Sequence, residues 1–325
     1  HEYEAHVRDK YCSAAVCEEL SSAPCQNRCP ANINVPEYVT LISKKKHVRA
    51  LELIRKRNPF SSVCGHICNH PCEILCRRGE LDESIAIKDL KRFASDFDLN
   101  KRKKAPVKKG MPTGKKVAII GGGPGGLTAA FFLRQFGHKT VVYEALPVAG
   151  GMLTVGIPEF RLQRSVPLDE IEYIKSAGVA IKTDTPIDDE NKFSKLLKTH
   201  DAVFIAIGAH KGRKMNIPGE DMDGIMDGVT FLRNINLGLP QNVGKNVTVI
   251  GAGNVAMDSA RVALRMGAGK VTVIYRRSRE EMPAQDEEIF EAMEEGIEFN
   301  CLTAPIEVLG TTNKIDGLKC VKMEL

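Results

Sequence analysis

The chain has 325 residues, of which 43% are hydrophobic, and its formal net charge is a mild +5. This length predicts two or three domains with ordinary hydrophobic cores. No apolar run approaches the roughly 20 residues that a membrane-spanning helix needs, and no signal peptide is visible, so a membrane or secreted protein is not expected. The chain begins without Met, as expected for a processed piece or for part of a longer polypeptide. We expect a cytoplasmic location.

Cysteines are concentrated at the beginning of the chain. Eight of the ten lie within the first 76 residues, while Cys301 and Cys320 are isolated near the end. The eight form two groups of four, which are Cys12, Cys17, Cys25 and Cys29, followed by Pro30, and then Cys64, Cys68, Cys72 and Cys76. Between the groups, residues 35–56 have helical periodicity, so a small helical domain is expected to carry both cysteine groups.

Four plus four thiolates match the ligands of two [4Fe–4S] clusters, and Cys-Pro at the end of a group is typical of ferredoxin-type ligand runs. Two zinc sites are an alternative, although the interval from Cys17 to Cys25 is too open for a zinc knuckle. Disulfides are the other alternative, which a chain with nucleotide folds and no secretion signal disfavours. His66 and His70 flank the second group and are expected at the surface or behind the ligands.

Residues 84–97 predict a helix that closes this domain. The following segment, 101–115, is rich in Lys, Pro and Gly and predicts a basic linker. Binding of nucleic acid by this run is the weakest alternative, because no aromatic residues are interspersed with the charges.

A strand, a glycine turn and a helix begin at Lys116. Gly121, Gly123 and Gly126 have the spacing that lets a dinucleotide pyrophosphate approach the backbone at a helix N-terminus. The second predicted strand, from Lys139, ends at Glu144, where a carboxylate can accept hydrogen bonds from a ribose diol. A glycine turn without a ligand is the alternative.

Further elements follow this turn. Gly150 and Gly151 permit close approach of the backbone to a ligand. Residues 166–177 predict an amphipathic helix, residues 179–183 a strand, and residues 201–208 a buried strand that ends in glycine.

A second nucleotide-binding pattern begins at Asn246. Gly251 and Gly253 repeat the first two glycines, and Ala256 takes the third place. After the helix predicted at 257–266 and the strand from Lys270, the segment Tyr275-Arg276-Arg277 replaces the acid of the first pattern. Arginines bind a 2′-phosphate that a carboxylate repels, so the first pattern suits FAD or NAD and the second suits NADP(H). Plain solvated charge is the alternative for the two arginines.

The predicted fold class is α/β, with two Rossmann-like dinucleotide-binding domains preceded by a small helical iron–sulfur domain. The expected domains are the helical domain at 1–100, the linker at 101–115, an FAD-binding domain at 116–240 and an NADPH-binding domain at 241–325. One nucleotide domain is expected to be inserted into the other.

From about Cys25 to its end the chain resembles the glutamate synthase small-subunit family. This family includes the NADPH-oxidising end of dihydropyrimidine dehydrogenase and the large subunit of electron-bifurcating NADH-dependent ferredoxin:NADP oxidoreductase. The motifs that carry the resemblance are Cys-x3-Cys-Pro at Cys25, Cys-Gly-His-Ile-Cys at Cys64, Gly-Gly-Gly-Pro-Gly-Gly at Gly121, Gly-Gly-Met-Leu-Thr-Val-Gly-Ile-Pro at Gly150, and Tyr-Arg-Arg-Ser-Arg-Glu-Glu-Met-Pro at Tyr275.

The resemblance implies two nucleotide sites and two clusters. The residues implied for FAD are Gly121, Gly123, Pro124, Gly125, Gly126, Glu144, Gly150, Gly151, Met152 and Leu153, with Arg161 near the flavin. Those implied for NADPH are Gly251, Gly253, Asn254, Val255, Arg276 and Arg277. Cys12, Cys17, Cys25 and Cys76 are expected on one cluster, and Cys29, Cys68 and Cys72 on the other.

Three departures from the family pattern affect these expectations. Lys91 stands where some relatives have a Gln or Glu ligand, so Cys64 is the expected fourth ligand of the second cluster. The first 20 residues resemble instead the tail of an NADH dehydrogenase flavoprotein subunit, which indicates a fusion or a multi-enzyme complex. The chain ends at Leu325, before the segment with which the family completes its FAD domain, so both nucleotide domains are expected to be incomplete.

The expected function is transfer of electrons between NADP(H), FAD and the clusters, with no side-chain acid or base required. A transhydrogenase or electron-bifurcating complex is the first interpretation, with an NADH dehydrogenase-like flavoprotein and ferredoxin as partners. A glutamate synthase small subunit is the second. A non-catalytic structural arm of a larger redox complex is the third.

Overall fold

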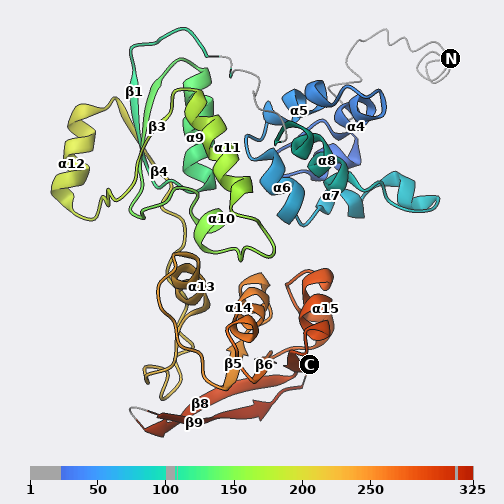
Figure 1. Cartoon of the computed structure of the whole chain (residues 1–325), viewed down its shortest axis with the longest axis vertical. Coiled ribbons are helices and arrows are strands. Elements are labelled where there is room, and N and C mark those ends of the chain that lie inside the picture. Colours follow the sequence, from blue (N-terminus) through green and yellow to red (C-terminus); the bar gives the residue numbers. More distant parts are fainter. Residues whose placement is uncertain (1–22, 100–106, 108, 312–313, 325) are drawn as a thin grey trace. The chain divides into compact units, whose positions relative to one another are not determined.

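The computed structural model describes residues 23–99, 107, 109–311 and 314–324 (Figure 1). The chain divides into two compact units, which we call the helical unit (His1–Val107 with Glu172–Ser176) and the α/β unit (Lys108–Ile171 with Ala177–Leu325). All strands of the described residues belong to the α/β unit. Cys12 and Cys17, both expected to bind a cluster, lie outside the described residues.

The helical unit is built from short helices. The described N-terminal residues of this unit form the helices α3 (Pro24–Arg28), α4 (Val35–Ser43), α5 (His47–Arg55), α6 (Ser61–Ile67), α7 (Pro71–Ile74), the 3₁₀ turn η1 (Arg77–Glu80) and α8 (Ile87–Leu99). The segment expected to be helical over 35–56 forms two helices, because the chain turns at Lys45, which has a φ of 58°. Asn34 caps α4 by accepting the Glu37 N–H at 3.2 Å.

One hydrophobic core joins the helices of this unit. Its buried residues are Ile33, Val35, Tyr38, Ile42, Ala50, Ile54, Cys72, Ile87 and Ala94. The Tyr38 hydroxyl donates to the Ile87 carbonyl at 3.2 Å and so ties α4 to the start of α8. A Cβ atom at Gly65 would lie only 2.7 Å from the Arg92 Cα, so α6 and α8 pack with their backbones close together. Cys72 therefore lies in a rigidly packed interior.

The first half of the α/β unit contains a parallel sheet with the strand order β3-β2-β1-β4. The strands are β1 (Lys116–Ile120), β2 (Lys139–Tyr143), β3 (Ala180–Lys182) and β4 (Ala202–Ile205). The helices between them are α9 (Pro124–Gln135), α10 (Met152–Val155), α11 (Ser165–Ser176) and α12 (Glu190–Thr199). The βαβ connection from β1 through α9 to β2 is the one that the first glycine pattern predicted.

The expectation of a buried strand over 201–208 was wrong. In the described residues β4 pairs only with β1 and forms an edge of the sheet. Phe204 is 45% exposed and Ile205 is 58% exposed, although both belong to an apolar run that resembles a central strand. The amino-acid composition of a segment determines how readily it forms a strand. The burial of that strand depends on which elements cover it.

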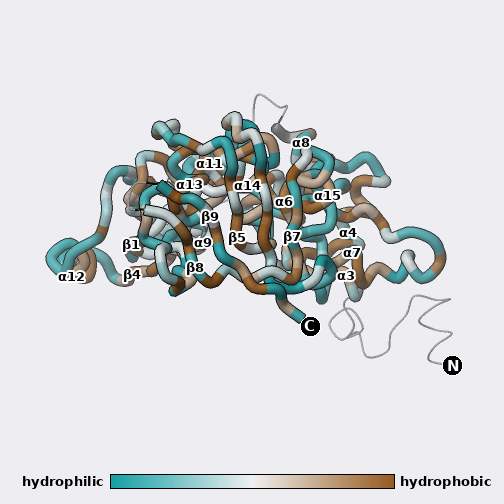
Figure 2. Tube along the Cα trace, turned by 90° about the horizontal axis from the view of Figure 1, so that it is seen from below, coloured by the Kyte–Doolittle hydropathy of each residue, from teal (hydrophilic) through white to brown (hydrophobic). Residues whose placement is uncertain are grey.

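The second half of the α/β unit has a parallel sheet in the order β5-β6-β7 and an antiparallel pair, β8-β9. Its elements are α13 (Gly228–Asn236), β5 (Asn246–Ile250), α14 (Asn254–Arg265), β6 (Lys270–Ile274), η2 (Arg279–Glu281), α15 (Asp286–Glu294), β7 (Glu298–Asn300), β8 (Thr303–Thr311) and β9 (Lys314–Lys322). Apolar and polar residues alternate along α14 (Figure 2), and Met257, Ala260 and Ala263 lie in the core.

The α/β class with two Rossmann-like βαβ units is confirmed. None of the helices that the structure describes is long and apolar enough to cross a membrane.

Candidate functional site

The two glycine turns have the same backbone arrangement. We call residues 121–126 the first glycine turn and residues 251–256 the second. Gly121 has a φ of 106° and Gly251 a φ of 114°, a region that favours glycine. The Gly121 N–H donates to the Tyr143 carbonyl at 2.8 Å, and the Gly251 N–H donates to the Ile274 carbonyl at 2.9 Å. Each turn is thereby held against the end of the neighbouring strand.

Each turn opens a helix whose first N–H groups have no side-chain cap. Gly123 precedes α9 and Gly253 precedes α14, and neither helix has a side-chain hydrogen bond at its N-cap. Exposed residues occupy the first helical positions, which are Pro124 and Gly125 in α9 and Asn254 and Val255 in α14. Free N–H groups at a helix start are suited to a pyrophosphate.

Glu144 lies directly beside the first glycine turn. Its carboxylate accepts the Gly122 N–H at 2.6 Å through Oε2 and the Leu146 N–H at 2.8 Å through Oε1. The residue is only 7% exposed, so two backbone hydrogen bonds compensate for burial of the charge. The structure thus brings the acid and the glycine turn together, as a ribose site requires.

Gly150 and Gly151 also lie against the first glycine turn. The Gly150 N–H donates to the Gly122 carbonyl at 2.7 Å. Gly151 has a φ of 53°, and a Cβ atom there would lie 2.8 Å from the Gly123 Cα. The helix α10 begins at once with Met152 and Leu153. All the residues expected to bind FAD except Arg161 therefore belong to the first glycine turn or to segments beside it.

Arg276 and Arg277 follow β6, one and two residues beyond Tyr275, which occupies the position that Glu144 has after β2. Both side chains are exposed. Arg277 lies 3.8 Å from a Glu281 oxygen, and within the described residues no ion pair of Arg276 is found. Glu281 and Ser278 form a capping box that fixes the next turn, η2. The two arginines therefore follow the strand beside the second glycine turn, and their side chains are exposed.

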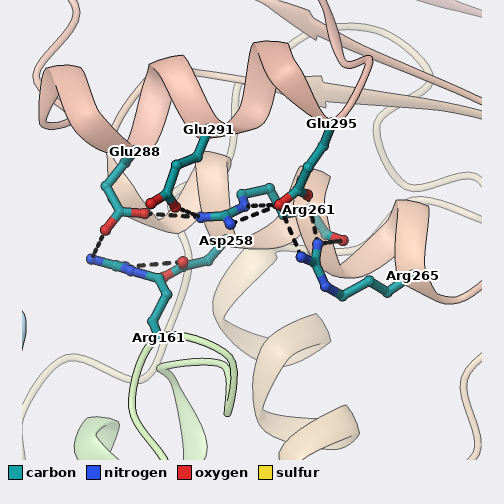
Figure 3. A network of polar contacts seen from close by, with 7 residues as sticks. All are labelled: Arg161, Asp258, Arg261, Arg265, Glu288, Glu291 and Glu295. Carbon is teal, nitrogen blue, oxygen red and sulfur yellow. Dashed lines mark hydrogen bonds and ion pairs between the residues drawn. The ribbon is translucent and has the colours of Figure 1, made fainter.

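Arg161 pairs with two carboxylates of the second half of the α/β unit (Figure 3). Its Nη1 donates to the two oxygens of Asp258 at 2.9 and 2.8 Å, and its Nη2 lies 2.7 Å from Glu288 Oε1. Arg161 and Asp258 are 10% and 5% exposed. Sequence reasoning placed Arg161 near the flavin, which stays a prediction, and missed both partners. The one available signal of this pairing was Asp258, a charged residue that follows Met257 on the buried side of α14.

The network continues along α14 and α15. Arg261 lies 2.7 Å from both Glu291 and Glu295, and Arg265 lies 2.6 Å from Glu295. These arginines hold the pKa of Glu295 down at about 2, and Arg261 and Arg265 both stack on the Phe160 ring. The loop that carries Phe160 and Arg161 is therefore fixed to α14 by aromatic and ionic contacts together.

Burial raises the pKa of Asp258 to about 6, although Arg161 and Arg261 oppose the shift and Glu288 adds to it. The folded protein then holds this proton more tightly than the unfolded chain, so stability falls as pH rises from about 4 to about 6. We expect Asp258→Asn to remove about 3 kcal/mol of this pH dependence. Urea unfolding of both proteins at several pH values measures it. Asp286→Asn, which changes an exposed carboxylate of α15, is the control, and an unchanged pH dependence in Asp258→Asn would contradict the argument.

The described cysteines expected to bind metal lie in the helical unit, and Cys25, Cys29, Cys68, Cys72 and Cys76 are free thiols. Cys72 is buried in the core, and Cys25 and Cys29 pack against it. Burial raises the pKa of Cys72 to about 11, Lys91 opposes this shift, and Cys68 and Cys29 add to it. Burial also raises the pKa of Cys25, with smaller contributions from Cys76 and Cys29. Cys25 thus lies near Cys76 and Cys29, and Cys72 lies near Cys68 and Cys29, so these contacts gather the thiols without separating them into the two expected ligand sets.

No group of three or more His, Cys, Asp or Glu side chains is positioned to hold one metal ion in the part of the chain that the structure describes. A four-iron cluster spaces its thiolates further apart than a single ion does, because each iron takes one of them. Cys25, Cys29 and Cys72 lie at the core of the helical unit, and their thiolates are the soft ligands that such a cluster takes. The disulfide alternative receives no support from the described cysteines.

Two family models match the chain. Residues 115–323 match "Pyridine nucleotide-disulphide oxidoreductase", and residues 2–103 match "Dihydropyrimidine dehydrogenase domain II, 4Fe-4S cluster". Among solved structures, the FprA oxidoreductase of Mycobacterium tuberculosis has a TM-score of 0.56 at 20% identity, covering 65% of this chain and 64% of that chain. This likeness shows the fold alone.

Curated relatives are similar over almost the whole chain. The NADP(+)-dependent formate dehydrogenase subunit beta of Moorella thermoacetica is 44% identical over 94% of this chain, and the NADPH-Fe(3+) oxidoreductase subunit beta of Geobacter sulfurreducens is 43% identical over 94%. The chain spans 46% of the length of each. The glutamate synthase [NADPH] small chain of Escherichia coli is 34% identical over 95% of this chain and 68% of the relative. The chain therefore belongs to the pyridine nucleotide-disulphide oxidoreductase family, and its N-terminal part matches a 4Fe-4S domain of dihydropyrimidine dehydrogenase.

Proposed function

We propose that the chain is an electron-transfer module that exchanges electrons between NADP(H), FAD and two [4Fe–4S] clusters within a larger redox complex. The observation that carries this proposal is the chemical contrast between two otherwise similar glycine turns. Glu144 directly follows the neighbouring strand in the first, whereas Tyr275 and then Arg276 and Arg277 follow it in the second. An acid suits a ribose diol and arginines suit a 2′-phosphate.

In this assignment the first glycine turn, Glu144 and the segment from Gly150 to Leu153 hold FAD. The second glycine turn with Arg276 and Arg277 holds NADP(H). When bound, FAD takes electrons from NADPH as a hydride pair and passes them on singly, which the clusters can accept. The residues of this chain supply binding, orientation and exclusion of water, so we assign no catalytic side chain.

The helical unit takes the role of the electron relay. Cys12, Cys17, Cys25 and Cys76 are assigned to one cluster, and Cys29, Cys64, Cys68 and Cys72 to the other. The proximity of Cys72 to Cys68 and Cys29 supports the second set, whereas Cys25 lies near both Cys76 of its own set and Cys29 of the other. The domain limits assigned to these functions are 1–100 for the clusters, 116–240 for FAD and 241–325 for NADP(H).

The surrounding complex is inferred from the relatives, which are named as subunits of redox enzymes. A transhydrogenase or electron-bifurcating complex with an NADH dehydrogenase-like flavoprotein and ferredoxin is the favoured setting, and its place is the cytoplasm. A glutamate synthase small subunit is the second candidate, favoured by the similarity to the Escherichia coli small chain. Glutamate formation from glutamine and 2-oxoglutarate by the native complex distinguishes the second from the first.

The nucleotide assignment predicts the effect of replacing both arginines. Arg276→Gln with Arg277→Gln is expected to weaken NADPH binding by about tenfold to a hundredfold and to leave NADH binding almost unchanged, because only NADPH carries the 2′-phosphate. Titration of the full chain with each nucleotide, followed by nicotinamide fluorescence, gives both dissociation constants.

Lys270→Gln is the control for this change, since it removes an exposed charge at the opposite end of β6. The control is expected to bind both nucleotides as the wild type does. Equal losses for NADPH and NADH in the double variant would contradict the assignment of the arginines. Absence of NADPH binding by the wild type would contradict the proposed function itself.

A further inference from the structure

Lys91 is unusual among the lysines of this chain. Of the lysines that the structure describes, it alone is buried, with 7% of its surface exposed. It belongs to the buried side of α8, together with Ile87, Ala94 and Ser95. Lysines are almost never fully buried unless they are paired, because removing an ammonium ion from water costs several kcal/mol.

The structure shows no carboxylate that compensates for this charge. Within the described residues the Lys91 ammonium forms no ion pair. The nearby Glu73 is already engaged, since it accepts the Lys88 N–H at 2.7 Å and lies 3.2 Å from His70. On this side of α8, Ile87 and Ala94 lie on either side of Lys91 and pack in the same core as Cys72, which is itself 8% exposed. The missing anion therefore belongs on the Cys72 side of α8.

Close packing prevents α8 from turning Lys91 into solvent. The helix is held to α4 by the hydrogen bond between Tyr38 and Ile87 and to α6 by the near contact of Gly65 with Arg92. The Ser95 hydroxyl donates to the Lys91 carbonyl at 2.9 Å, within the same buried turn. Lys91 thus stays on the side of α8 that packs on the core containing Cys72.

We propose that Lys91 is the cation that offsets the negative charge of the cluster assigned to Cys29, Cys64, Cys68 and Cys72, and that it raises the midpoint potential of this cluster. The inference deepens the proposed function and rests on its ligand assignment. One electron from the reduced flavin enters the cluster, whose iron is reduced and whose net charge becomes more negative by one. A fixed positive charge nearby favours that reduced form and raises the midpoint potential.

Lys91→Met, Lys91→Arg and Arg92→Gln, each in the anaerobically prepared full chain, test this inference. Arg92 is the matched control, because it is the next residue of α8, carries the same charge and is half exposed. Redox titration followed by electron paramagnetic resonance measures each midpoint potential, and iron and sulfide analysis measures occupancy. We expect Lys91→Met to lower one midpoint at unchanged iron content, and Lys91→Arg and Arg92→Gln to keep both.

An unchanged pair of midpoints in Lys91→Met, with full iron content, would overturn the inference. If Lys91→Met assembles less iron, Lys91→Arg decides: wild-type iron and midpoints in that variant support a role for the charge, and loss of iron there as well overturns it. Failure of the proposed function is distinct from these results, because the wild-type chain itself would then show no iron–sulfur signals.

Discussion

Replacing Cys72 with serine is expected to remove roughly half of the iron that the wild-type chain binds, because one of the two proposed clusters loses a ligand. A serine hydroxyl is not ionised at neutral pH and is a hard ligand, whereas iron–sulfur clusters prefer soft thiolates. The loss also reaches the fold, since Cys72 lies in the core of the helical unit and metal binding is coupled to folding. Iron and sulfide analysis and thermal unfolding measure the two effects.

Cys301→Ser is the matched control for Cys72→Ser. Cys301 is a partly buried free thiol of the α/β unit, packed beside the core of that unit and far along the chain from both cysteine groups. The control is expected to keep the full iron content. Full iron content in Cys72→Ser would contradict the ligand assignment, and loss in the control as well would show that the change acts through general destabilisation.

Gly121→Ala is expected to destabilise the α/β unit by about 2–5 kcal/mol, because backbone strain and a steric clash add together. Gly121 has a φ of 106°, and a Cβ atom there would fall inside contact distance of the Ala206 carbonyl oxygen. That oxygen belongs to the backbone just after β4 and has no rotamer with which to move away. Urea unfolding of the flavin-free chain measures the change in the free energy of unfolding.

Gly125→Ala is the control from the same turn and is expected to have the opposite sign. A Cβ atom at Gly125 meets nothing within 4 Å, and the residue lies in the first turn of α9. Alanine there lowers the entropy of the unfolded chain and stabilises the helix by about 0.4–1 kcal/mol. Similar losses of stability for both variants would show that the arrangement of the first glycine turn is not the cause.

The parts of the fold that were predictable from sequence are those that local patterns encode. The glycine spacing at Gly121 and Gly251 predicted a strand, a turn and a helix in both places, and both formed. The burial of β4 was not predictable, because the apolar run from Ala202 contains no information about which strands flank it. The break at Lys45 depends on a single residue with positive φ, which helical periodicity does not reveal.

The site shows the same division between local and distant information. Glu144 was placed correctly beside the first glycine turn, because the βαβ topology fixes where the second strand ends. The pairing of Arg161 with Asp258 spans 97 positions and has no local pattern. The burial of Lys91 was also missed, since a single lysine in an amphipathic helix is expected to face water. Both omissions concern charges whose positions are set by tertiary packing.

If FAD and NADP(H) bind as proposed, the way Glu144 is held affects how long each nucleotide stays bound. Two backbone hydrogen bonds already fix its side chain, so binding a ribose there costs little further rotamer entropy. Arg276 and Arg277 are exposed and must be immobilised when a phosphate arrives, at a cost of about 0.5–1.5 kcal/mol for each side chain. A preorganised first site suits a cofactor that remains through many turnovers. A second site that must order its side chains each time suits a substrate that binds, reacts and leaves.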